Sequence, residues 1–177
     1  MNNLNNKNIN LRALEPSDLE LLYQWENNME IWEVSNTLAP FSRYVLKQYL
    51  ENAHQDIFEA KQLRLVIELT SKQTPIGLID LFDYDPFHQR AGIGILIHNP
   101  SDRSKGLASE ALETFCNYAF EVLCLHQLYC NITSDNLSSI KLFKNAGFQT
   151  AGIKKEWIKN PKGYTDEILL QRFNPYY

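Results

Sequence analysis

The chain has 177 residues and a formal net charge of −4, with 44% hydrophobic and 21% charged residues. A chain of this length fits one domain, spanning residues 1–177, with a substantial buried core. The composition is that of a globular protein and excludes the disordered and fibrous classes. The mild acidity argues against a general nucleic-acid binder, which usually presents a basic face.

The N-terminal segment and the cysteines bear on location and on metal binding. The segment MNNLNNKNINLRAL has asparagines where a secretory signal needs an apolar stretch, and no later run is long enough to cross a membrane. We therefore expect a cytoplasmic protein without a membrane partner. Cys116, Cys124 and Cys130 lack CxxC spacing and the histidines are scattered, so we expect structural thiols and no metal site.

Hydrophobic periodicity predicts the elements of the first half of the chain. We expect a strand at 9–14 and then a helix from Pro16 that carries the apolar residues Leu19, Leu22, Trp25 and Met29. A second helix after Ser42 should bury Val45, Leu46, Tyr49 and Leu50. A meander of strands should follow at 63–69, 75–84 and 90–98. The first half thus combines helices with an antiparallel meander.

The second half alternates helices and strands before a final pair of strands. We expect a helix at about 104–123, a strand at 126–133, a helix from Asn136 that stops at a left-handed Gly147, and strands at about 148–158 and 164–173 around the turn NPKG. The order βααβββαβαββ predicts an α/β fold with helices on both faces of a mixed sheet.

The stretch PSDRSKGLASEAL, residues 100–112, predicts an anion site. It runs from the end of a strand through a loop with Arg103, Lys105 and Gly106 into a helix. A helix N-terminus offers unpaired backbone N–H groups and a partial positive charge, and glycine has no Cβ to block a phosphate. Taken alone, the same residues also suit a solvated turn.

Two motifs, this loop and the later run NLSSIKLFKNAGF, carry a resemblance to a known family. The matching positions are Arg103, Gly106, Ala108, Asn136, Ser139, Gly147 and Phe148. In this order and on these elements they resemble the Gcn5-related N-acetyltransferase (GNAT) family, from about residue 9 to residue 173. The resemblance implies a single-domain GNAT fold with a mixed, mostly antiparallel central sheet of about seven strands, and acetyl-CoA as the cofactor.

The resemblance also implies how acetyl-CoA is held: its pyrophosphate on the loop, its pantetheine arm along the backbone amides of residues 95–97, and its acetyl end beside the helix from Asn136. The residues implied are Ile95, Leu96, Ile97, Arg103, Ser104, Lys105, Gly106, Leu107, Ala108, Asn136, Ser139 and Phe143. A splay from the strand at 126–133 is implied too. Gly92 and Gly94 suit a bulge or close ligand approach there, or simple crowding in the core.

Within the family the chain is most similar to the spermidine and ribosomal-protein alanine acetyltransferase branches, and the spermidine branch is nearer. Two departures from that branch weaken the inference that this chain acts on the same substrate. Gly92 stands where an acidic residue is expected, and the loop at 33–40 has one carboxylate, Glu33, where that branch has more.

Attack on a thioester needs a neutral amine, yet a primary amine with a pKa of about 10.4 is mostly protonated at neutral pH. Asp80, which matches a substrate-side glutamate of the spermidine branch, is our first prediction for the base, directly or through water, and Glu33 is the second. Strict alternation places Asp83 and Asp85 on a face that Asp80 does not share. Either predicted base is also explained as a solvated surface charge.

The group that protonates the leaving thiolate is a tyrosine in the family, and Phe143 stands in its place. A thiol has a pKa of about 8.5, so the thiolate leaves tolerably without concerted protonation. Ser139, one helical turn earlier, is the substitute that we predict, with a surface hydroxyl as the alternative. The sequence does not place Tyr129 and Tyr164 relative to this pocket.

Three hypotheses for function follow. The first is acetyl transfer from acetyl-CoA to a primary amine of a polyamine-like small molecule. The second is acetylation of a protein N-terminal amine, and the third is a GNAT-fold module that binds CoA without turnover. We also expect a homo-oligomer, a dimer or larger.

Overall fold

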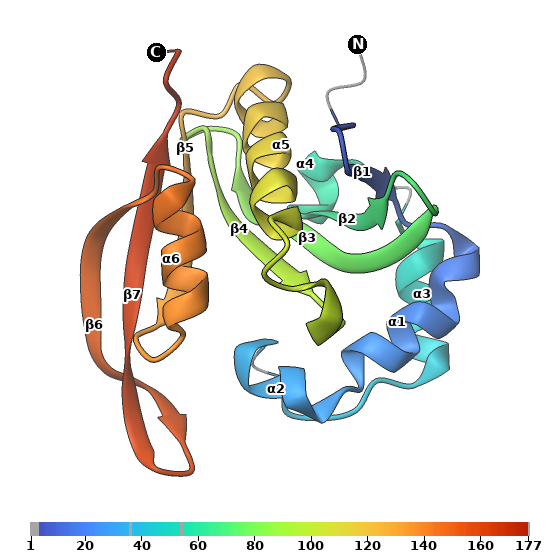
Figure 1. Ribbon diagram of the computed structural model, residues 1–177, viewed down its shortest axis with the longest axis horizontal. Coiled ribbons are helices and arrows are strands. Elements are labelled where there is room, and N and C mark those ends of the chain that lie inside the picture. Colours follow the sequence, from blue (N-terminus) through green and yellow to red (C-terminus); the bar gives the residue numbers. More distant parts are fainter. Residues whose placement is uncertain (1–3, 36, 54, 177) are drawn as a thin grey trace.

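The computed structural model describes residues 4–35, 37–53 and 55–176, and within these ranges one seven-stranded sheet is flanked by helices on both faces (Figure 1). The strands are β1 (Ile9–Ala13), β2 (Leu63–Leu69), β3 (Thr74–Asp85), β4 (Arg90–Ile97), β5 (Gln127–Thr133), β6 (Gln149–Asn160) and β7 (Gly163–Phe173). The helices are α1 (Leu19–Glu26), α2 (Met29–Ser35), α3 (Arg43–Glu51), α4 (Ile57–Ala60), α5 (Leu107–Glu121) and α6 (Leu137–Asn145), with 3-10 turns at Pro16–Asp18 and Pro100–Asp102.

The strand order across the sheet is β1-β2-β3-β4-β5-β7-β6. All neighbouring strands pair antiparallel except β4 and β5, which pair parallel. The structure therefore confirms the predicted α/β fold with a mixed, mostly antiparallel sheet.

The sheet opens between β4 and β5. Their pairing begins at Arg90 with Gln127 and ends at Gly92 with Tyr129, although β4 continues to Ile97. In Figure 1 the two strands lie together at the top of the view and diverge below. The predicted splay is thus confirmed, and Gly92 and Tyr129 mark the fork where it starts.

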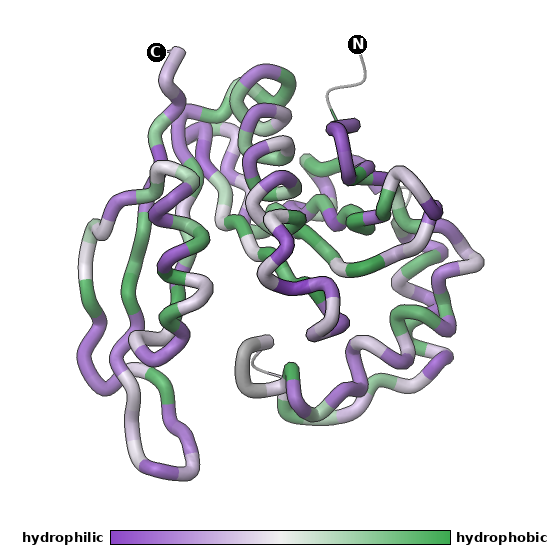
Figure 2. Tube along the Cα trace, viewed as in Figure 1, coloured by the Kyte–Doolittle hydropathy of each residue, from purple (hydrophilic) through white to green (hydrophobic). Residues whose placement is uncertain are grey.

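Each face of the sheet carries its own hydrophobic cluster. On one face, which we call the α5 face, α5 and α6 bury Leu112, Phe115 and Phe143 against the strands. On the opposite α1 face, α1 and α3 pack against β2 and β3 through Leu22 and Leu46. Burying a Leu or Phe side chain stabilises by about 1.5–3 kcal/mol, so these clusters hold both helical layers on the sheet. The hydrophobic strands between the layers stand out in green in Figure 2.

The N-terminal helical segment differs from the prediction because Asn27 interrupts it. The Asn27 side chain donates to the carbonyls of Tyr23 (2.9 Å) and Phe41 (3.0 Å) and accepts from the Phe41 N–H (2.8 Å). These bonds end α1 and tie it to the segment that leads into α3. Met29, expected at helical spacing with the buried residues, begins α2 and is 74% exposed. Val45, expected in the buried stripe of α3, is about half exposed as well.

The cysteines are free thiols. Cys116 and Cys130 are buried, and burial raises the pKa of each thiol to about 12. Cys124 is exposed instead. None of the described helices combines the length and the hydropathy that a membrane crossing requires.

Candidate active site

The N-terminus of α5 is open and has the backbone geometry that suits an anion. Gly106 caps it with a φ of 80°, and a Cβ there would meet nothing within 4 Å. The first hydrogen bond of the helix runs from the Glu110 N–H to the Gly106 carbonyl, so the N–H groups of Leu107 and Ala108 have no partner within the helix. The Leu107 side chain is buried in the core, so this residue offers its backbone N–H alone.

The two cations of the loop differ in what they hold. Arg103 donates from Nε to the Ile97 carbonyl (3.0 Å) and from Nη2 to the His98 carbonyl (3.1 Å). Its guanidinium therefore fastens the loop to the end of β4, a structural task that the sequence did not predict. Lys105 lies 3.4 Å from Asp102 and is largely exposed. The loop is strongly hydrophilic, as its purple colour shows in Figure 2.

Beyond the fork, one edge of β4 has no strand beside it. The His98 N–H donates to the Ile76 carbonyl of the segment that begins β3, which sets the alternation of the ladder. By that alternation the backbone groups of Leu96 turn toward β3, and those of Ile95 and Ile97 turn toward the opening. The backbone of Leu96 is thus not at the open edge, which corrects one of the three positions expected there.

On α6, Asn136 and Phe143 have structural tasks. Asn136 caps the helix by accepting from the Ser139 N–H at 3.2 Å. Phe143 is 3% exposed and packs edge-on against Phe148, with ring centroids 5.0 Å apart. The apolar ring is thus part of the core, and the expectation that Phe143 lines the cofactor site stays a prediction. Ser139 is only partly buried, and its hydroxyl has no hydrogen-bond partner among the described residues.

Asp80 lies on the α1 face but is held by an arginine. Its Oδ1 accepts from Arg64 Nε at 2.6 Å and its Oδ2 accepts from Nη2 at 3.3 Å. Arg64 also donates to Glu26 of α1 at 2.7 Å. Because both oxygens of Asp80 are engaged, taking up a proton there would disturb an ion-pair cluster that joins β2, β3 and α1.

A bulge in β3 brings a different carboxylate to the fork. The β3–β4 register shifts between Phe82 and Asp85, and Asp83 adopts a left-handed φ of 50°. Tyr129 donates from its hydroxyl to Asp83 Oδ2 at 3.2 Å, and its ring meets Phe82 edge-on. Phe82 is two residues from Asp80 and shares its face, so the bulge overturns the expectation that Asp83 and Asp80 point apart.

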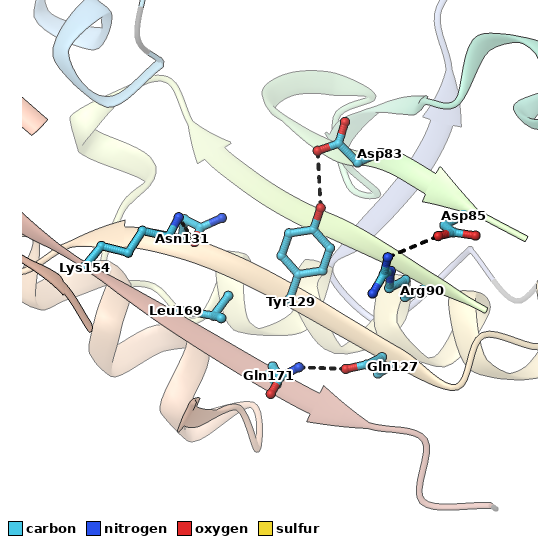
Figure 3. A pocket seen from close by; sticks show the side chains of 9 residues that line it. All are labelled: Asp83, Asp85, Arg90, Gln127, Tyr129, Asn131, Lys154, Leu169 and Gln171. Carbon is cyan, nitrogen blue, oxygen red and sulfur yellow. Dashed lines mark hydrogen bonds and ion pairs between the residues drawn. The ribbon is translucent and has the colours of Figure 1, made fainter. Parts of the chain in front are cut away.

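Asp83 and Tyr129 line an open pocket of about 460 Å³ (Figure 3). Asp85 pairs with Arg90 at 3.3 Å on one side of it, and Lys154 lies at the far end. Within the described part of the chain, Asp83 has no cationic partner. Burial, with the charge of Asp83 second, raises the pKa of Tyr129, so the phenol keeps its proton at neutral pH. Glu33 belongs to α2, but its side chain is outside the described residues.

Comparison with known proteins identifies the family. The family model described as "Acetyltransferase (GNAT) domain" matches residues 8–149. The chain belongs to the GNAT acetyltransferase family. It is an acetyl-CoA-dependent N-acetyltransferase, as the resemblance implied.

The GNAT relatives include several enzymes that act on spermidine. The chain is 31% identical to the spermidine N(1)-acetyltransferase of Escherichia coli K12 over 147 residues, which cover 81% of this chain and 74% of the relative. It is 28% identical to a probable N-acetyltransferase of Bacillus subtilis, YjcK, with 97% of both chains covered. The structure of the Vibrio cholerae spermidine N-acetyltransferase in complex with CoA and spermine superposes with a TM-score of 0.85 at 26% identity, covering 96% of this chain and 97% of that one.

The residues present fit acetyl-CoA, which supplies an acetyl group activated as a thioester. The open space at Gly106 and the unpaired N–H groups of Leu107 and Ala108 suit its pyrophosphate. The N–H and carbonyl of Ile95 and the N–H of Ile97, at the open edge of β4, suit the amide groups of its pantetheine arm, whereas the Ile97 carbonyl already accepts from Arg103. The loop and the fork lie at opposite ends of that free edge, so a cofactor held along it would have its phosphates at one end and its thioester at the other.

Proposed function

We propose that this GNAT enzyme transfers acetyl from acetyl-CoA to a primary amine of a polyamine-like small molecule, by direct attack of the amine on the thioester. In the transfer a C–N bond forms and the C–S bond breaks, while the amine loses a proton and the thiolate gains one. The observation that carries the proposal is the fork at Gly92 and Tyr129, with a free strand edge beyond it and Asp83 next to it.

The carboxylate of Asp83 supports a cationic acceptor. An ammonium group is attracted to Asp83, which lacks a cationic partner among the described residues, and Asp83 then accepts its proton directly or through water. Asp80 and Glu33 stay predictions for the same task, and Asp80 is the less available of these carboxylates because Arg64 binds both its oxygens. The spermidine acetyltransferases among the relatives support the same substrate class.

Ser139 is the residue that we propose for returning a proton to the thiolate. It lies one helical turn before Phe143, at the N-terminal end of α6, with its hydroxyl free of hydrogen bonds to the described residues. The positive end of the helix dipole would also stabilise a thiolate there.

The experiment is a thiol-release assay with acetyl-CoA and a panel of amines: putrescine, spermidine, spermine, an aminoglycoside, and peptides with a free N-terminus. We expect amine-dependent thiol release with the polyamines. Binding of acetyl-CoA with no thiol release in the presence of any of these amines would reject the proposed acceptor class. Thiol release with the peptides alone would favour a protein N-terminus as the acceptor.

We further propose that the chain forms a homo-oligomer. A Vibrio cholerae relative at 26% identity has a structure described as dodecameric, and it superposes with a TM-score of 0.79. Here the edge strand β6 exposes 59% of Trp157 and 53% of Ile153, which suits a contact between copies. Sedimentation velocity would test this, and a single monomeric species at assay concentration would contradict it.

A further inference from the structure

The ring of Phe82 covers the glycines of β4 at the fork. Phe82 lies directly opposite Gly92, and a Cβ built on Gly92 would overlap the Phe82 ring. A Cβ on Gly94 would lie 3.7 Å from Cε1 of the same ring. The absence of side chains at 92 and 94 is therefore what allows the ring to lie across β4 there.

A second aromatic ring extends this surface across the fork to β5. The rings of Phe82 and Tyr129 meet edge to face, with centroids 6.1 Å apart and planes at 82°. Both side chains are partly exposed, so the rings present an accessible wall. Among the described residues, one charged side chain is hydrogen-bonded to these two aromatic residues. It is Asp83, which accepts from the Tyr129 hydroxyl.

We propose that Phe82 and Tyr129 form an aromatic wall that selects acceptors whose reacting amine is carried on an unbranched methylene chain. This rests on the proposed function and assigns Phe82 as a specificity-determining residue. Methylene groups next to the amine lose water favourably against the two rings, while the ammonium group reaches Asp83. Desolvation beside the rings also disfavours the charged amine, which helps to produce the neutral nucleophile.

The same wall disfavours an N-terminal α-amine. In a peptide the carbon next to the amine carries a carbonyl, and that group would lie against the apolar face of a ring, which offers no donor to replace its water. The wall thus distinguishes an aminoalkyl acceptor, such as an aminopropyl or aminobutyl arm, from a protein N-terminus.

The test compares kcat/KM for butylamine, putrescine and spermidine with kcat/KM for a peptide whose α-amine is its one amine. In the unmodified enzyme we expect the aminoalkyl substrates to be preferred. Phe82→Ala should raise KM for the aminoalkyl substrates by about tenfold or more and so reduce the ratio of their kcat/KM to that of the peptide. Phe82→Tyr, which keeps the ring, should retain that ratio. Phe87→Ala removes an exposed ring in the β3–β4 turn and serves as the control, with no expected change.

A second pair of variants tests the packing itself. Gly92→Ala should lower the melting temperature because its methyl group competes with Phe82, and Phe82→Ala in the same chain should recover part of the loss. If Phe82→Ala does not fold, Phe82→Leu takes its place in the kinetic comparison.

The outcomes separate the two proposals. If the enzyme accepts polyamines but kcat/KM falls by the same factor for every acceptor in the Phe82 variants, the aromatic wall alone is overturned. The same holds if the unmodified enzyme prefers the peptide to butylamine. An enzyme that binds acetyl-CoA and accepts no amine of the panel would overturn the proposed function as well.

Discussion

The hydroxyl of Tyr129 donates a hydrogen bond of 3.2 Å to Asp83 at the point where β4 and β5 part. Asp83 does not reach this position by regular strand geometry, since it depends on the bulge in β3. The bond holds the carboxylate beside the fork and keeps the phenol protonated, because burial and the carboxylate both raise the pKa of Tyr129. We therefore propose that the acceptor loses its proton on the α1 face, opposite α5 and α6.

Gly106→Trp should weaken acetyl-CoA binding by more than about tenfold, because the indole would fill the space in front of the unpaired N–H groups of α5. Gly163→Trp is the matched control, since Gly163 also has a positive φ and open surroundings but begins β7, directly after the β6–β7 turn. Calorimetric titration with CoA measures both. Equal affinities in the two variants would reject the loop as the phosphate site.

Arg64→Met should destabilise the fold by about 2 kcal/mol, because it leaves the carboxylates of Glu26 and Asp80 partly buried without their shared partner. For a domain of this size that corresponds to a fall of several degrees in the melting temperature, roughly 2–4 °C per kcal/mol. Thermal unfolding measures it, with Arg43→Met, which breaks an exposed pair with Glu20, as the control. Similar melting temperatures for the two variants would contradict a structural role for the cluster.

Stability should fall as the pH drops below about 6.5, the ordinary pKa of histidine. Burial, with the charge of Arg103 second, lowers the pKa of His98, whose Nδ1 is buried without a hydrogen-bond partner among the described residues and whose ring stacks on Trp25. Between the lowered pKa and 6.5 the unfolded chain holds a proton that the folded chain lacks, so stability is complete above 6.5 and is lost toward lower pH. Melting curves from pH 7.5 to 5.0 measure this, and His98→Gln should lose less over that interval. Parallel pH curves for the two proteins would refute this role of His98.

Ser139→Ala should reduce kcat if the serine protonates the thiolate, by less than the roughly 10²-fold or more that removal of a general acid usually causes, because a thiolate is a good leaving group. Ser138→Ala changes the neighbouring hydroxyl, which donates to Asn136, and is the control. Steady-state rates at saturating amine give the comparison. An unchanged kcat in Ser139→Ala would assign the proton to water.

Much of the fold could be predicted because periodicity reports directly on burial. Apolar residues recur at helical spacing from Leu107 to Glu121, and the structure has a helix over that run. The conformation of the loop before α5 was also predictable, since Gly106 precedes the helix and carries the left-handed conformation that glycine permits.

The parts that sequence reasoning missed depend on contacts between distant residues. The break between α1 and α2 comes from the bonds of Asn27 to Phe41, and the task of Arg103 comes from carbonyls that β4 leaves free at its end. The position of Asp83 depends on a bulge, which strict alternation does not reveal. Gly92 was the available signal, because a glycine opposite Phe82 indicates that a ring occupies the space of a missing side chain.

Comparison of Asp83→Asn with Asp80→Asn tests the central claim most directly, with kcat/KM for spermidine measured at saturating acetyl-CoA. If Asp83 accepts the proton of the acceptor at the fork, Asp83→Asn should lower kcat/KM by about 10²-fold or more. Asp80→Asn should lower the stability of the fold and leave kcat/KM much less affected. Full activity in Asp83→Asn, with a loss of that size in Asp80→Asn, would contradict the account.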